Sequence, residues 1–287
     1  NCNNWSSIAN EILGPITDED CKKMAQTMLN EKIPNVQKIQ GRGNSRIYKV
    51  VTETNQVYAL KYYPDLLIDP RNRLQTEVLS CQLLETYQLT PKVIAYDAEL
   101  NIAIYEWIEG DHLQSVENEH IDQALNFIKI LQDIETPEFS KPASEACTSA
   151  EQLFHQIEER HKKLDSIENN ILQNFLNTIF KPLYLDVKNW STQQWPANNF
   201  NKILATSKQT LSPSDFGIHN SIMRSDGTLC FLDLEYFGWD DPVKLIADFI
   251  WHPAMTLNDD HKNRWVKNSF LIFKNTEEMR QRFHAAW

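Results

Sequence analysis

The chain of 287 residues has few basic side chains relative to its acids. Lysine and arginine number 28 against 39 aspartates and glutamates, which gives a formal net charge of −11. Binding to nucleic acid depends on a basic surface, so nucleic acid is not expected as a partner. A cationic small substrate would suit this balance better, although many acidic proteins have no acidic site.

Patterned cysteines and long apolar runs are also missing. The five cysteines are odd in number and form no C-x-x-C, so neither a disulfide framework nor a zinc site is indicated. No apolar run approaches the roughly 18 residues of a membrane helix, and there is no signal-peptide pattern. We therefore expect a cytoplasmic protein in a reducing compartment, with no membrane partner.

Three common catalytic motifs are absent as well. The sequence contains no H-E-x-x-H, no G-x-S-x-G and no G-x-x-x-x-G-K-[ST]. Zinc proteases, serine hydrolases and P-loop enzymes therefore lose their main sequence support.

Residues 1–107 are predicted to form a strand-rich lobe. Thr17-Asp-Glu-Asp predicts a capped helix that runs to about Asn30. Alternating apolar residues predict about five strands, with a helix over 71–87 after the third. The predicted strands cover 36–39, 46–52, 57–63, 92–96 and 101–107.

Residues 108–287 are predicted to form a larger, mainly helical lobe. Apolar residues at helical spacing mark a helix over 121–134, and further helices are predicted over 150–180 and 242–287. The segment 188–199, rich in Trp, Gln and Asn, is predicted to be a loop. The whole is an α+β arrangement, and a nucleotide is expected near the junction at 106–110.

Asp215, Asn220 and Asp233 form the most informative pattern in the chain. The first two have the D-x-x-x-x-N spacing that kinases use for the base that receives the substrate hydroxyl proton and for an amide that holds magnesium. Asp233 follows an apolar strand over 229–232, and Asp226-Gly227 signals a two-residue hairpin loop. Such a hairpin would return Asp233 to Asn220, so that their oxygens could share one magnesium ion.

Gly41, Gly43 and Ser45 lie between two predicted strands. Glycine lets backbone N–H groups approach phosphates closely, and Ser45 could add a donor. An ordinary hairpin turn explains these residues equally well, because a lone G-x-G is a weak signal.

Lys61 lies near the end of a predicted strand, in a run that resembles the V-A-I-K of kinases. A strand lysine is more often a solvated edge residue. On the buried side it would need a carboxylate, which Glu77 on the following helix could supply, with Glu85 as the competitor. A Lys61–Glu77 pair would direct Lys61 to the α- and β-phosphates of a nucleotide.

The run 102–110 is apolar and then polar. The backbone of Glu106 and Ile108 could bind the edge of an adenine, although a core strand is the simpler interpretation. His219 and His252 are both interpreted as packing residues.

Together these residues resemble the aminoglycoside phosphotransferase and choline kinase family of small-molecule kinases, over roughly residues 36–252. The family's catalytic loop commonly reads H-G-D-x-x-x-x-N, followed by I-D-x-E and then G-x-x-x-D-P. The corresponding residues are Pro213-Ser-Asp215 to Asn220, Leu232-Asp-Leu-Glu235 and Gly238-Trp-Asp-Asp-Pro242. The chain departs from the pattern at Pro213-Ser214, in place of His-Gly, and at Leu245, where the family has an acid and this chain has Asp248 nearby.

The resemblance implies a bilobal protein-kinase-like fold and an ATP- or GTP-dependent phosphotransferase. It implies that Asp215 is the catalytic base, that Asn220 and Asp233 bind Mg²⁺, and that Glu77 holds Lys61 against the nucleotide phosphates. The acceptor would be a hydroxyl of a small aminoglycoside-, choline- or sugar-like molecule.

Two other hypotheses stay open. A kinase-shaped protein that binds a nucleotide or ligand without turnover is allowed by Pro213-Ser214, but the intact Asp215, Asn220, Asp233 and Lys61 argue against it. A metal-dependent hydrolase would leave the strand lysine and the glycine loop unexplained.

Overall fold

The computed structural model describes residues 17–39, 46–64, 66–67, 69–135, 139, 141–196, 199–274 and 276–286. The chain divides into two compact units, each built from two stretches of sequence. The first comprises Asn1–Ser115 and Ile218–Phe237, and the second comprises Val116–Gly217 and Gly238–Trp287. Asn220 and Asp233 therefore belong to the same unit as Lys61. The predicted lobe boundary after residue 107 stays a prediction.

A five-stranded antiparallel sheet with the order β1-β2-β3-β5-β4 forms the first unit's framework. Its strands are β1 (Asn35–Ile39), β2 (Arg46–Val51), β3 (Val57–Tyr62), β4 (Val93–Asp97) and β5 (Ile102–Glu106). All five predicted strands are thus confirmed. On the central strand β3, Lys61 pairs with Ile47 of β2 and Ala103 of β5.

The helix α2 (Asp18–Leu29) covers one face of this sheet. As predicted, it begins after Thr17, whose hydroxyl accepts a hydrogen bond from the Asp20 N–H at 3.1 Å. Buried Cys21 and Ala25 of this helix belong to one core cluster with residues of the sheet, including Leu60. The apolar face of α2 and alternate strand residues therefore form a common core.

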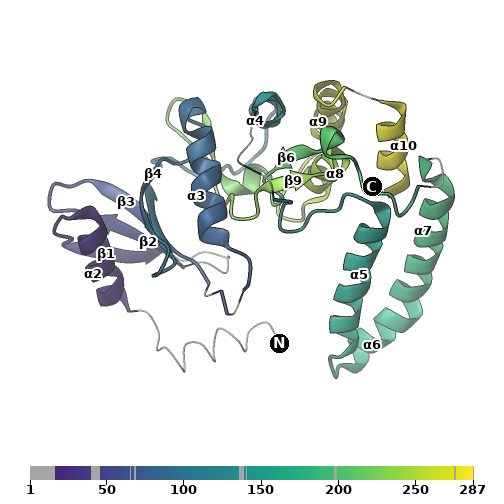
Figure 1. Ribbon diagram of the computed structural model, residues 1–287, viewed down its shortest axis with the longest axis horizontal. Helices are drawn as coiled ribbons and strands as arrows, with labels where there is room; N and C mark the ends of the chain where they lie inside the picture. Colours follow the sequence, from purple (N-terminus) through teal and green to yellow (C-terminus); the bar gives the residue numbers. More distant parts are fainter. Residues whose placement is uncertain are drawn as a thin grey trace. The chain divides into compact units, whose positions relative to one another are not determined.

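The helix α3 (Arg73–Leu84) lies on the opposite face. Side chains alternate between faces along a strand, so Lys61 points away from Leu60 and toward Glu77 of α3. Asn72 caps α3 by accepting a hydrogen bond from the Gln75 N–H, and a 3₁₀ turn over Glu85–Tyr87 continues it. Figure 1 shows the sheet between α2 and α3.

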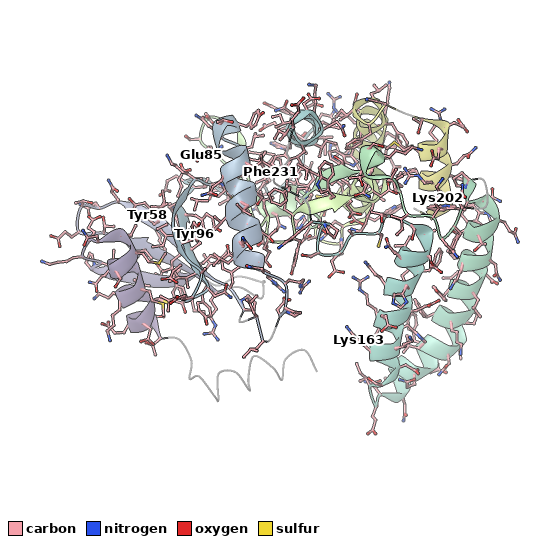
Figure 2. The ribbon with its side chains drawn as sticks, in the orientation of Figure 1. Tyr58, Glu85, Tyr96, Lys163, Lys202 and Phe231 are labelled. Carbon is pink, nitrogen blue, oxygen red and sulfur yellow. The ribbon has the colours of Figure 1, made fainter. Side chains whose placement is uncertain are left out.

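The first unit also contains the hairpin of β7 (Ser221–Met223) and β8 (Leu229–Phe231). Phe231, labelled in Figure 2, donates its N–H to the carbonyl of Leu89 at 2.8 Å, just beyond the end of α3. Met223 of β7 exchanges two backbone hydrogen bonds with Asp111, at 2.9 and 3.2 Å. These contacts attach a late segment of the chain to the strand-rich unit.

The second unit is mainly helical. Its helices are α4 (Asn118–Asp133), α5 (Ala150–Asp165), α6 (Asn170–Phe175), α7 (Lys181–Gln194), α8 (Pro242–Trp251), α9 (Asp259–Ile272) and α10 (Glu277–Ala286). A short two-stranded sheet pairs β6 (Thr210–Ser212) with β9 (Gly238–Asp240). Together with the sheet of the first unit, these helices confirm the predicted α+β class.

One predicted loop is wrong. The segment 188–199 continues α7 as far as Gln194 instead of forming a loop throughout. No glycine or proline interrupts it before Pro196, and Trp190 packs edge-on against His284 of α10, with ring centroids 5.2 Å apart. Tertiary packing therefore outweighs the modest helix propensity of its Trp and Asn residues. Figure 1 shows α7 beside α5, and Lys188 joins Glu158 between them at 2.6 Å.

None of the helices among the described residues is long and apolar enough to cross a membrane. Cys21, Cys81, Cys147 and Cys230 are buried as thiols.

Candidate active site

Lys61 lies at the centre of three carboxylates, of which Glu77 and Glu235 are buried and Asp233 is partly exposed. Its Nζ donates hydrogen bonds to Oε2 of Glu77 at 2.6 Å and to Oδ1 of Asp233 at 2.5 Å, and lies 3.1 Å from Oε2 of Glu235. Lys61 is 6% exposed, so these contacts replace its hydration. The predicted Lys61–Glu77 contact is present, whereas the competing Glu85 pairs with Lys92 at 3.2 Å.

Two tyrosines fix the Glu77 carboxylate. The Tyr63 hydroxyl donates to Oε2 of Glu77 at 2.8 Å and shares a hydrogen bond of 2.7 Å with the Tyr105 hydroxyl. Tyr63 follows β3 and Tyr105 lies on β5, so the sheet itself positions both rings. Glu77 is thereby held from two sides, by Lys61 and by Tyr63.

The carboxylates determine the protonation of this cluster. Burial alone would lower the pKa of Lys61, but the charges of Glu77, Asp233 and Glu235 outweigh it and raise that pKa well above its ordinary value. Burial raises the pKa of Glu77 to about 7, against the opposing charge of Lys61. Lys61 is therefore a cation whose single charge is shared among several acids.

A second layer of charges supports Glu235. Arg73 donates to Oε1 of Glu235 at 2.6 Å and also bonds Asp69. Arg71 binds Asp69 through two hydrogen bonds of 2.7 Å. Burial opposes the charge of Asp69, but the hydrogen bonds from Arg71 and Arg73 outweigh it and lower its pKa to about 2.

Sequence reasoning did not assign roles to these supporting residues. The signal for Glu235 was present, because it ends the run Leu232-Asp-Leu-Glu235 and lies two residues after Asp233. Nothing local in the sequence indicates that Arg73 reaches Glu235, which is 162 residues away.

The hairpin of β7 and β8 brings Asn220 next to the residue before Asp233. Ser221 pairs with Phe231, and the carbonyl of Asn220 accepts a hydrogen bond from the Leu232 N–H at 2.8 Å. The predicted return of the chain is thus confirmed. The loop differs in detail, because Arg224 accepts from the Gly227 N–H at 3.0 Å and donates to Thr228 at 2.9 Å, which gives a three-residue loop. Gly227 has φ +85°, the left-handed conformation that this loop type requires.

The donors around Asp233 fit a hard divalent cation. Asp233 has φ +64°, an unusual backbone conformation for a residue with a side chain, and its side chain is 39% exposed. Asn220 carries an amide oxygen and Asp233 a carboxylate, which are ligand types that Mg²⁺ prefers. Because Lys61 contacts three carboxylates, a further positive charge beside Asp233 would relieve their repulsion.

Asp215 lies in a tight turn that follows β6. Ser214 has φ +70°, a conformation that glycine adopts most readily, and its N–H donates to the Ser212 hydroxyl at 3.1 Å. The Asp215 N–H donates to the Pro213 carbonyl at 3.0 Å. Ser214 therefore adopts the backbone conformation that a glycine at this position would favour.

Phe216 anchors this turn in the core of the second unit. Its ring stacks on Phe127 of α4 at 5.0 Å and lies 5.8 Å from Phe249 of α8. Phe249 in turn stacks on Trp265 of α9 at 3.7 Å. The aromatic core thus fixes the backbone beside Asp215, whose side chain stays 38% exposed.

His252 contacts Asp215, which sequence reasoning did not anticipate. Its Nε2 lies 3.1 Å from Oδ1 of Asp215. His252 follows the last residue of α8, one helical turn beyond Asp248 and two beyond Lys244. That spacing of Lys244, Asp248 and His252 along one helical face was visible in the sequence, and it is the signal that could have drawn attention to His252.

The structure describes some of the residues that the sequence predicts to contact the nucleotide. The N–H of Glu106 donates to the Lys92 carbonyl at 2.8 Å and its side chain accepts from the Lys92 N–H at 3.2 Å, so Glu106 joins β5 to the start of β4. Ile108 is buried just beyond the strand. Gly41, Gly43 and Ser45 lie outside the described residues.

Solved structures with the same fold are enzymes that phosphorylate small molecules. The aminoglycoside phosphotransferase APH(2'')-Ib, solved with ADP, is 16% identical at a TM-score of 0.61, and the match covers 94% of this chain and 86% of that one. The choline kinase LicA from Streptococcus pneumoniae is 18% identical at 0.55, covering 93% and 96%. A Plasmodium vivax ethanolamine kinase is 18% identical at 0.58, covering 93% and 78%. These likenesses confirm the protein-kinase-like fold.

A protein-family model covers most of the chain. No curated protein gives a significant match. The model of the phosphotransferase enzyme family matches residues 35–268, which include the sheet, Lys61, the β7–β8 hairpin and Asp215. The chain therefore belongs to the phosphotransferase enzyme family.

Proposed function

We propose that the chain transfers the γ-phosphoryl group of ATP to a hydroxyl of a small polar molecule, with Mg²⁺. The observation that carries the proposal is the buried Lys61 in contact with Glu77, Asp233 and Glu235. A buried lysine in contact with three acids serves no packing purpose that an apolar residue would not serve better. A lysine held in this way is suited to binding nucleotide phosphates.

Each side chain has a distinct role in this proposal. Lys61, held by Glu77, binds the α- and β-phosphates. The backbone at Ile108 contacts the adenine, because the backbone N–H of Glu106 is already hydrogen-bonded to the Lys92 carbonyl. Asn220 and Asp233 would hold Mg²⁺, which would neutralise charge on the phosphates. Gly41, Gly43 and Ser45 are proposed to cover the phosphates.

Asp215 is proposed as the base. The acceptor oxygen forms a bond to the γ-phosphorus, the bond from that phosphorus to the β–γ bridging oxygen breaks, and ADP leaves. The hydroxyl proton passes to the Asp215 carboxylate. Positioning and charge neutralisation supply most of the rate enhancement in such transfers.

The acceptor class is proposed from the relatives and from charge. The similar structures include kinases of choline, ethanolamine and aminoglycosides. These acceptors are cationic, and this chain has a net charge of −11. We therefore propose a cationic amino alcohol or aminoglycoside as acceptor.

The test is release of ADP or GDP from Mg–ATP or Mg–GTP in the presence of choline, ethanolamine, gentamicin, streptomycin, spectinomycin or a neutral sugar. Acceptor-stimulated release with at least one compound is expected. Asp215→Asn should lower the transfer rate by about 10²–10⁴-fold and leave nucleotide binding unchanged. Asp233→Asn should instead raise the magnesium concentration needed for half-maximal rate.

Two outcomes would contradict the assignment. Nucleotide binding without turnover on any acceptor would favour the non-catalytic, kinase-shaped alternative. Wild-type rates in both variants would show that residues 212–235 are structural only.

A further inference from the structure

The hydrogen bonds of the His252 ring show which group donates in its contact with Asp215. His252 Nδ1 accepts a hydrogen bond from the Ala254 N–H at 3.2 Å, two residues along the chain. In neutral imidazole one ring nitrogen accepts and the other carries the proton. Because Nδ1 accepts, the proton is on Nε2, which lies 3.1 Å from Oδ1 of Asp215. His252 therefore donates to the Asp215 carboxylate, as an orienting group does.

The chain around His252 holds the ring in this orientation. His252 is the C-cap residue that follows α8, and it has the extended backbone (φ −62°, ψ 123°) expected before Pro253. The turn that begins there is closed by a hydrogen bond from the Met255 N–H to the His252 carbonyl at 3.0 Å. The ring is 25% exposed, so it is partly enclosed by protein and still reached by solvent.

The helix α8, which precedes His252, carries the ion pair of Lys244 and Asp248 on the face that is in line with His252. Lys244 donates to Oδ2 of Asp248 at 2.5 Å and lies 3.5 Å from Oδ2 of Asp240. Lys244 is 7% exposed, and it pairs with Asp248, one turn before His252, and with the buried Asp240 that precedes the helix. α8 is therefore anchored by ion pairs next to the point where His252 meets Asp215.

The turn before Asp215 is held by hydrogen bonds from backbone N–H groups. The Ser214 N–H donates to the Ser212 hydroxyl at 3.1 Å, and the Asp215 N–H donates to the Pro213 carbonyl at 3.0 Å. We propose that His252 is a positioning residue that orients the Asp215 carboxylate through a hydrogen bond from its Nε2–H to Oδ1 of Asp215. The catalytic part of this inference rests on the proposed function, whereas the hydrogen bond does not.

The kinetic test uses three variants and an acceptor on which the wild type is active. His252→Ala removes the donor and should lower kcat about 10- to 100-fold, with KM for ATP and for the acceptor unchanged. His252→Gln keeps an amide N–H near the position of Nε2 and should restore the rate to within about threefold. His155→Ala, at an exposed position of α5, should have no effect.

The kinetic results can also overturn the proposal. A raised acceptor KM with unchanged kcat in His252→Ala would make His252 a substrate contact instead. An equal loss of kcat in His252→Ala and His252→Gln, at equal melting temperatures, would exclude a role for the Nε2–H donor of His252.

An NMR measurement tests the hydrogen bond without turnover. In ¹⁵N-histidine-labelled protein at pH 8, the resonance absent from His252→Gln identifies His252. The Nε2–H tautomer is expected, with an Nε2 shift that changes in Asp215→Ala. An Nδ1–H tautomer, or a shift that does not respond to Asp215→Ala, would overturn the inference. If the wild type phosphorylates no acceptor, the proposed function fails while this measurement still decides the contact.

Discussion

At the scale of single residues, Lys61 makes the largest set of buried charge contacts among the residues that the structure describes. It is buried and contacts three carboxylates, so its removal leaves acids without their main counter-charge. Breaking a buried ion pair by removing one partner commonly destabilises a protein by about 3–5 kcal/mol. The proposed function and the stability of the fold would therefore depend on the same side chain.

Lys61→Met is expected to abolish transfer and to lower the free energy of unfolding by about 3 kcal/mol. The double variant Lys61→Met/Glu77→Gln removes one of the stranded acids, so it should recover part of the stability but none of the activity. Urea denaturation and transfer assays on the same preparations separate the two effects. Appreciable transfer by Lys61→Met would remove the nucleotide role of Lys61.

Asp69 makes a pH-dependent contribution to stability. Its pKa is lowered to about 2 in the folded protein, against 3.8 for the ordinary group. A carboxylate with a lowered folded pKa stabilises the protein fully above its unfolded pKa, and this contribution disappears as the pH falls through the folded pKa. This lowering of the pKa corresponds to about 2 kcal/mol of stability at neutral pH.

Asp69→Asn should therefore be less stable than the wild type by at least about 2 kcal/mol at pH 7. The difference in free energy of unfolding between the wild type and Asp69→Asn should fall by about half at pH 3. Urea denaturation of both proteins at pH 7, 5 and 3 measures this difference. A difference that stays constant across this range would show that the charge of Asp69 is not what stabilises the fold.

At the scale of elements, the β7–β8 hairpin depends on a close backbone approach. Gly110 has φ +151°, and a Cβ added there would lie 2.1 Å from the Met223 carbonyl oxygen. The next residue, Asp111, exchanges hydrogen bonds with Met223. Glycine at position 110 therefore allows β7 to join the first unit, together with the Asn220 and Asp233 that flank the hairpin.

Gly110→Ala should destabilise the protein by about 2–4 kcal/mol, through backbone strain and the clash with Met223. Gly227→Ala is the matched control, because Gly227 also has positive φ but no atom lies within 4 Å of its added Cβ. The free energy of unfolding of Gly227→Ala should fall by only about 1–2 kcal/mol. Equal melting temperatures for the two variants would contradict the close-approach argument.

At the scale of the whole molecule, binding of Mg–nucleotide should stabilise the fold. A ligand that binds only the native state at one hundred times its dissociation constant adds about 2.7 kcal/mol. Thermal scans with ATP or GTP should show a rise in melting temperature that is larger with Mg²⁺ than with EDTA. Asp233→Asn should lose the magnesium-dependent part. No shift at millimolar nucleotide would contradict the nucleotide site.

Much of this protein followed from the sequence alone. The five strands, the capped helix α2 and the return of Asp233 toward Asn220 are local consequences of alternation, capping and turn residues, which act over a few positions. The Lys61–Glu77 contact was also predictable, because a buried strand lysine needs a nearby acid and few are in reach. The family followed from the order and spacing of motifs over 212–242.

Only the tertiary structure decided the rest. Lys61 meets Asp233 and Glu235 about 170 residues further along the chain, and His252 meets Asp215 from the end of another helix. The continuation of α7 through a segment of weak helix formers likewise depends on contact with α10. Such contacts join positions distant in sequence, so they depend on how the elements pack and leave no short-range pattern. Burial then sets the chemistry, because the same lysine and acids in water would be ordinary surface charges.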